Sequence, residues 1–134
     1  MSIKFKPDLK PVKQEKNNPH YKKKGKKATG ELDLFKRLWE EREHVSFLSG
    51  IPLDEFDVWQ MAHVLAKGQN KYPKFRLYPK NIVFLTSLEH HLWDNGTMDR
   101  RAIYQQEMLE TGYDCDWQRL YDLADELKKE YKKL

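Results

Sequence analysis

Apolar residues recur at helical spacing near both ends of the chain's folded part, and shorter apolar runs lie between them. Within residues 31–42 the apolar positions fall on one face, which predicts an amphipathic helix that Thr29 caps. The same spacing in residues 98–111 and 117–131 predicts two C-terminal helices, separated by a turn at Gly112. The folded part is therefore expected to begin and end with helices.

The middle of the chain has the pattern of short strands. Residues 56–65 are strand-like, and residues 81–85 read as a short buried strand. Thr86 or Ser87 caps a helix after that strand, and the basic, proline-punctuated stretch 69–80 forms the loop between the two strands. This order of elements predicts an α+β fold.

The length of 134 residues fits one domain, and charge divides the chain into two parts. Residues 1–30 contain ten lysines and two acidic residues, whereas the other 104 residues contain 15 basic and 19 acidic ones. We therefore expect a disordered basic arm at 1–29 and a single domain at 30–134, with its core at 44–96 and its last helices at 97–134.

A lysine-rich arm on a mildly acidic body suits nucleic-acid binding, because lysines displace counterions from phosphates. A solubilising tail without a partner explains the same composition about equally well. On the first interpretation the arm follows the DNA backbone without reading sequence, through Lys22, Lys23, Lys24, Lys26 and Lys27.

The composition also excludes several classes of protein. No apolar run approaches the roughly 20 residues of a membrane helix, and residues 1–13 lack the apolar segment of a secretory signal. Cys115 is the only cysteine, which excludes an internal disulfide framework and a cysteine-based zinc finger. We expect a soluble cytoplasmic protein without a membrane partner.

The residues with catalytic potential are two histidines, an asparagine and an aspartate. His90 and Asp94 share one face of the predicted helix, where an imidazole and a carboxylate can hold one divalent metal. His63, near the end of the predicted strand, can face that helix and take a proton from water, because histidine titrates near neutrality. Asn81 either fixes its loop or reaches the metal.

This order of residues resembles the HNH, or ββα-metal, nuclease superfamily. The superfamily's pattern of His, Asn and His is matched by His63, Asn81 and His90, with the same interval from the Asn to the second His. The resemblance covers about residues 44–96. It implies a small ββα-metal core of treble-clef type, here with an additional N-terminal helix and a C-terminal helical hairpin.

Many members of the superfamily hold a structural zinc with four cysteines. The corresponding positions here look like Ser46, Ser49, Thr86 and Glu89, so all four cysteines are absent while their spacing persists. The resemblance therefore implies a zinc-free frame, held by packing and hydrogen bonds. Ser46 and Ser49 are expected to stabilise turns and not to act as nucleophiles.

The stretch from Ala62 to Ile82 is also similar to phage recombination endonucleases of the Rap/NinG kind. The resemblance implies a metal-dependent DNA endonuclease of phage or mobile-element origin, acting in the bacterial host cell. It implies His63 as general base, Asn81 as a catalytic partner, and Mg²⁺ or Mn²⁺ at His90 and Asp94, with Zn²⁺ or Ni²⁺ as alternatives.

Two details depart from the superfamily's pattern or leave a choice open. Many members have a metal ligand directly before the general base, whereas this chain has Ala62 there. The metal then has fewer protein ligands, or activity has been lost. His91 is an alternative ligand to His90, but neighbouring residues on a helix point about 100° apart, and the spacing favours His90.

Further side chains near the site have two interpretations each. Lys67 and Arg76 are either phosphate contacts or solvated loop residues. Trp39, Trp59 and Trp93 are expected in the core and not as base-stacking platforms.

Two other functions remain: a catalytically inactive DNA-binding module on the HNH frame, and a helical interaction adaptor. The acidic C-terminal hairpin is compatible with a homodimer.

Overall fold

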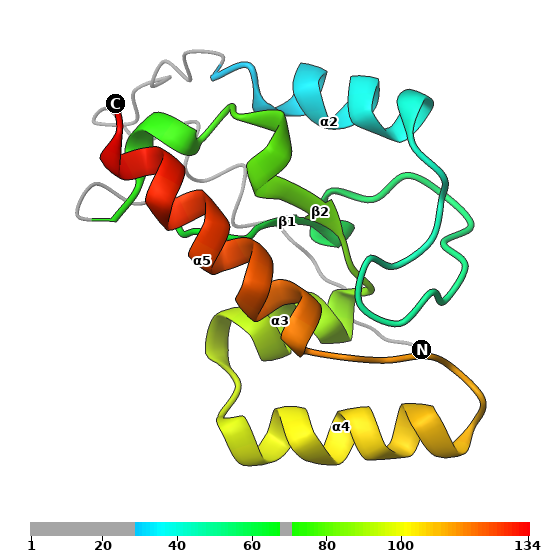
Figure 1. Ribbon diagram of the computed structural model, residues 1–134. Helices are drawn as coiled ribbons and strands as arrows, with labels where there is room; N and C mark the ends of the chain where they lie inside the picture. The colour runs from blue at the N-terminus through cyan, green and yellow to red at the C-terminus, as the bar shows by residue number, and fades with distance from the viewer. Residues whose placement is uncertain (1–28, 68–70) are drawn as a thin grey trace, which may run out of the picture.

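The structure is a computed structural model that describes residues 29–67 and 71–134, so the predicted basic arm lies outside the described residues. The described residues form a mixed α+β fold of four α-helices and one two-stranded antiparallel sheet (Figure 1), which confirms the predicted class. The main elements are α2 (Glu31–Glu41), β1 (Met61–His63), β2 (Ile82–Phe84), α3 (Ser87–Asn95), α4 (Met98–Glu110) and α5 (Gln118–Lys132).

The sheet separates two apolar cores, because alternate residues of a strand face opposite sides. On one side Met61 and Phe84, which pair across the strands, pack against the buried side chains of α2. On the other side Ala62 and Val83, also a pair, belong to a larger core with residues of α4 and α5. Accordingly, α2 and α5 lie on opposite sides of the sheet (Figure 1).

The predicted strand at 56–65 is wrong over most of its length. Only Met61–His63 is strand, and the 3-10 turn η2 (Val58–Gln60) precedes it. The cause is local: the carboxylate of Asp57 accepts a hydrogen bond from the Trp59 N–H at 2.9 Å, which favours a turn over an extended strand. Trp59 is 68% exposed as a result, so the expectation that it lies in the core is also wrong.

The predicted starts of α2 and α3 are confirmed, but the prediction that Thr29 caps α2 is wrong, because Gly30 occupies the N-cap position. Thr86 is the cap of α3, because its hydroxyl accepts from the Glu89 N–H at 3.1 Å while the Glu89 carboxylate accepts from the Thr86 N–H at 3.0 Å. At α2 the N–H of Glu31 donates to the Thr29 hydroxyl at 3.2 Å, although Gly30 occupies the cap position itself with a φ of 89°.

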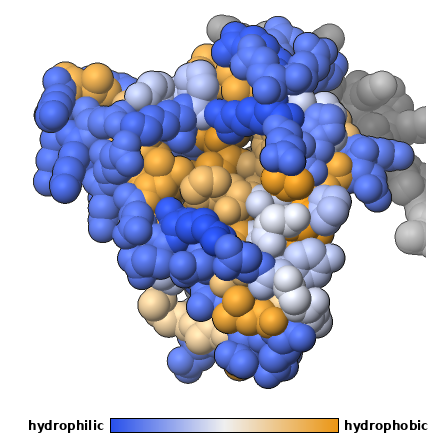
Figure 2. Space-filling model, turned by 45° about the vertical axis from the view of Figure 1, so that its right-hand side comes forward, coloured by the Kyte–Doolittle hydropathy of each residue, from blue (hydrophilic) through white to orange (hydrophobic). Residues whose placement is uncertain are grey.

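The two predicted C-terminal helices are confirmed. Each observed helix end lies at the predicted residue or one residue away from it. α5 buries Leu120 and Leu127 completely. α4 buries Tyr104 but leaves Ile103 and Leu109 58% and 45% exposed. Apolar patches are visible at the lower end of the molecule, where α4 lies (Figure 2). This surface is compatible with pairing of two copies, which stays a prediction.

The connection between the strands makes two further 3-10 turns, η3 (Pro73–Phe75) and η4 (Pro79–Asn81), each begun by one of the prolines that punctuate this loop. Within the described part of the chain, no helix has both the length and the apolar character needed to cross a membrane.

Candidate functional site

His63 ends β1 on the face of the sheet that meets α2. Its Nε2–H donates to the backbone carbonyl of Arg76 at 2.8 Å, which fixes the tautomer and leaves Nδ1 as an acceptor. The side chain is only 10% exposed. Burial lowers the pKa of His63 below its ordinary value, so the imidazole is neutral at pH 7 and able to accept a proton.

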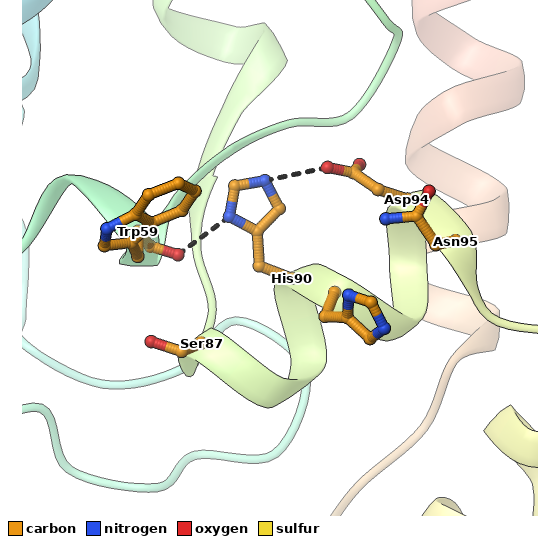
Figure 3. Close-up of a pocket in the computed structure, with 6 residues that line it drawn as sticks. Trp59, Ser87, His90, Asp94 and Asn95 are labelled. Atoms are coloured by element: carbon orange, nitrogen blue, oxygen red, sulfur yellow. Dashed lines mark hydrogen bonds and ion pairs between the residues drawn. The ribbon is translucent and has the colours of Figure 1, made fainter. Parts of the chain in front are cut away.

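His90 lies on α3 with both ring nitrogens engaged (Figure 3). Its Nδ1–H donates to the carbonyl of Trp59 at 2.7 Å, and Nε2 lies 3.1 Å from Oδ2 of Asp94. The hydrogen bond with Asp94 raises the pKa of His90, against the opposing effect of burial. Because Nδ1 carries a proton, the contact between Nε2 and the carboxylate is favourable only with a positive charge at Nε2, either a proton or a metal cation.

Both imidazoles line one groove of about 580 Å³, together with Lys67, Asp94 and Trp59. The predicted base and the predicted metal ligands therefore meet at one place. Their electrostatic tendencies differ: His63 is held neutral, whereas His90 attracts positive charge. A proton acceptor and a cation site beside the same space can together activate water against an anionic substrate.

Nε2 of His90 and a carboxylate oxygen of Asp94 are the atoms that could hold a divalent metal. The bond from Nδ1–H to the Trp59 carbonyl is the kind of support that orients a metal-binding imidazole. Among residues 29–67 and 71–134, no three His, Cys, Asp or Glu side chains gather as a metal-binding group. Two protein ligands leave most of the coordination shell to water and substrate phosphates, as in Mg²⁺ and Mn²⁺ sites, while the imidazole nitrogen also suits Zn²⁺ or Ni²⁺.

Asn81 is completely buried and braces the loop between the strands. Its Oδ1 accepts from the Leu65 N–H at 2.7 Å, and its Nδ2 donates to the carbonyls of Leu65 and Phe75 at 3.0 and 3.3 Å. Phe75 adjoins Arg76, whose carbonyl holds His63. Of the two roles that the sequence left open, the geometry matches loop fixing.

Lys67 and Arg76, the predicted phosphate contacts, both bind Glu31 of α2. The Lys67 ammonium lies 2.6 and 2.8 Å from the two carboxylate oxygens, and Arg76 Nε lies 2.9 Å from one of them. The same carboxylate approaches His63 Nε2 to 3.7 Å. No signal in the sequence pointed to Glu31 as a site residue, because an acidic residue in a first helical turn is ordinary.

The four positions that correspond to zinc-binding cysteines meet at one buried point. The hydroxyls of Ser46 and Ser49 donate to the two oxygens of Glu89, at 2.5 and 2.6 Å, and Thr86 closes the capping box. Tyr104 on α4 adds a fifth side chain, with its hydroxyl donating to Glu89 at 2.7 Å. This set, the Glu89 cluster, ties two loops and two helices together through hydrogen bonds.

Ala62 and His91, the sequence neighbours of His63 and His90, both lie outside the groove. Ala62 is completely buried in the core shared with α4 and α5, on the opposite face of β1 from His63. His91 is exposed and lines a smaller hollow beside His90, outside the groove that contains His63. The arm lysines lie outside the described residues.

Comparison with known proteins does not extend this picture: no family model, curated protein or solved structure matches the chain.

Replacing Glu31 with glutamine is expected to lower stability at neutral pH by about 1–2 kcal/mol. Burial alone would raise the pKa of Glu31, but hydrogen bonds from Lys67 and Arg76 outweigh it and hold the pKa below its ordinary value. The stabilisation is therefore present above the unfolded pKa and is lost as the pH falls through the lower folded pKa. Urea unfolding of both proteins between neutral and acidic pH measures it.

Glu41→Gln is the matched control, because the Glu41–Arg37 pair at 3.8 Å is largely exposed and should contribute little. A stability difference for Glu31→Gln that stays constant down to strongly acidic pH would contradict the assignment of the carboxylate's charge as its source.

Proposed function

We propose that the chain is a metal-dependent DNA endonuclease that hydrolyses phosphodiester bonds on a zinc-free HNH frame. One observation carries the proposal: His63, held neutral by burial, shares a groove with His90, which Asp94 draws toward positive charge. A general base and a cation site that face the same space are two requirements of phosphodiester hydrolysis at neutral pH.

Two features support the HNH frame. β1, β2 and α3 follow one another along the chain, with His63 on the first strand and His90 on the helix, as the name ββα-metal describes. In addition, the four zinc-ligand positions converge at Glu89, although nothing but their correspondence to cysteines suggested that they would. Thr86 and Glu89 also meet as a capping box, so the informative part of the convergence is the arrival of Ser46 and Ser49 at the same carboxylate.

In the proposed reaction His63 accepts a proton from water at Nδ1. Its Nε2–H stays bonded to the Arg76 carbonyl, which holds the ring in orientation and stabilises the imidazolium that forms. The activated water attacks phosphorus in line with the leaving 3′-oxygen. Lys67, which lines the groove with two of its donors on Glu31, offers its remaining N–H to a phosphate oxygen.

A divalent cation held by His90 and Asp94 would supply positive charge to the phosphate and the leaving oxygen. The chain prepares this position by turning the His90 ring with the Trp59 carbonyl. Asn81 acts at a distance as a positioning residue, because it braces the loop that carries the Arg76 carbonyl.

The experiment that tests the proposal is incubation of the full-length protein with supercoiled, linear and four-way-junction DNA. Each reaction contains Mg²⁺, Mn²⁺, Zn²⁺ or Ni²⁺, or an excess of EDTA. We expect cleavage with at least one cation and none in EDTA. Failure to cut every substrate with every cation would remove the nuclease proposal.

A non-catalytic DNA-binding module on the same frame is the second candidate. One observation favours it: within the described part of the chain no third His, Cys, Asp or Glu joins His90 and Asp94 in a metal-binding group. Its expected result in the same experiment is salt-dependent DNA binding without cleavage.

A further inference from the structure

Trp59 is a large apolar side chain that the fold leaves at the surface. It is 68% exposed, whereas tryptophan is normally among the residues with most of their surface buried. Its indole stacks on no other aromatic ring among residues 29–67 and 71–134. Val58 beside it is 43% exposed, so the two form an apolar rim. Stability of the fold does not explain this exposure, which costs hydrophobic free energy.

The backbone of Trp59 is fixed although its side chain is exposed. Its N–H donates to Asp57 at 2.9 Å and its carbonyl accepts from His90 at 2.7 Å. These bonds hold the turn η2 against α3, next to the candidate metal ligands (Figure 3). The indole is thus presented from a rigid base, which lowers the entropy that a ligand must overcome to stack on it.

The surroundings of the indole combine the chemistry of a nucleotide site. Trp59 lines the same groove as Lys67, His63 and the pair His90 and Asp94, so an aromatic face lies beside a cation and the proposed reaction centre. A nucleotide presents an aromatic base next to an anionic phosphate, and so has the complementary arrangement. Stacking of a base on an aromatic side chain is sequence-tolerant and strong enough to determine affinity.

We propose that Trp59 stacks on an unpaired DNA base adjacent to the attacked phosphate, which makes DNA with unpaired nucleotides the preferred substrate class. This inference rests on the proposed nuclease function. In a continuous duplex the neighbouring base pairs cover both faces of each base, so an indole at the surface can stack only where a base is unpaired, displaced or terminal.

The test measures binding without cleavage, using full-length protein in EDTA and fluorescently labelled DNA. A single-stranded oligonucleotide and a relaxed, covalently closed circular duplex, which has neither unpaired nor terminal bases, are compared by anisotropy titration. Trp59→Ala is expected to weaken single-strand binding about 5- to 100-fold and to leave duplex binding unchanged. Trp59→Phe keeps a smaller ring and should lose part of that affinity. Ile103→Ala, which removes exposed apolar surface from α4 away from the groove, is the matched control.

The stacking itself has a separate readout. A 2-aminopurine base in the single strand should be quenched by the wild-type protein and not by Trp59→Ala. Undiminished single-strand binding by Trp59→Ala, or an equal loss with both DNAs, overturns the inference. These results are distinct from failure of the nuclease proposal, which would show as absence of cleavage by the wild-type protein whatever Trp59 binds.

Discussion

Replacement of His63 with alanine is expected to lower the rate of DNA cleavage by about 10²- to 10⁴-fold, the usual contribution of a general base. The imidazole is the one group in the groove that burial holds neutral, and its Nδ1 is left as an acceptor by the bond from Nε2–H to Arg76. DNA affinity should change little, because a neutral imidazole releases no counterions from DNA. Initial rates of nicking and anisotropy titrations measure the two effects separately.

His91→Ala serves as the matched control, because His91 is an exposed histidine of α3 that does not line the groove. It should cleave at the wild-type rate, whereas His90→Ala should require much more metal for cleavage. Near wild-type cleavage by His63→Ala would show that another group is the base. A fall in His91→Ala as large as that in His90→Ala would give His91 a part in metal binding.

Replacement of Glu89 with alanine is expected to destabilise the fold by about 3–5 kcal/mol, a large part of the stability of an ordinary domain. Glu89 is completely buried and accepts hydrogen bonds from Ser46, Ser49 and Tyr104 as well as from the Thr86 N–H. The alanine variant leaves these buried donors without an acceptor and also creates a cavity. Urea unfolding followed by circular dichroism measures the loss.

Tyr104→Phe extends the measurement to a variant that still folds. It removes one donor to Glu89 and leaves the other three, so a loss of about 1 kcal/mol is expected. If Glu89→Ala proves too unstable to purify, the single-donor variant still tests the cluster. A Glu89→Ala protein as stable as the wild type would contradict the role of the cluster in holding the fold.

The elements that the sequence predicted well are those whose signals are local. Helical spacing marked α2, α4 and α5, and the cap at Thr86 marked the start of α3, because amphipathic periodicity and capping depend on neighbours along the chain. The intervals from His63 to Asn81 and His90 identified the residues that line the groove or brace its loop. Those intervals are informative because a strand, a loop and a helix of fixed lengths place residues at fixed separations along the chain next to one another in space.

The errors and omissions arose where a single side chain or a distant contact decides the structure. Asp57 caps a turn and so removes Val58 and Trp59 from the expected strand, an outcome that the apolar pattern alone does not contain. Glu31 reaches the site only because α2 packs over the end of β1. No local pattern distinguishes it from other acidic residues that begin helices.

The Glu89 cluster also bears on how the protein withstands oxidants. Scaffolds held by zinc and thiolates lose their metal when the sulfur is oxidised, but this cluster contains only oxygen and nitrogen donors. The chain's only thiol, at Cys115, is buried, and burial raises its pKa to about 11, which leaves it protonated and unreactive near neutrality. Peroxide therefore finds no reactive thiol in the frame that carries the groove.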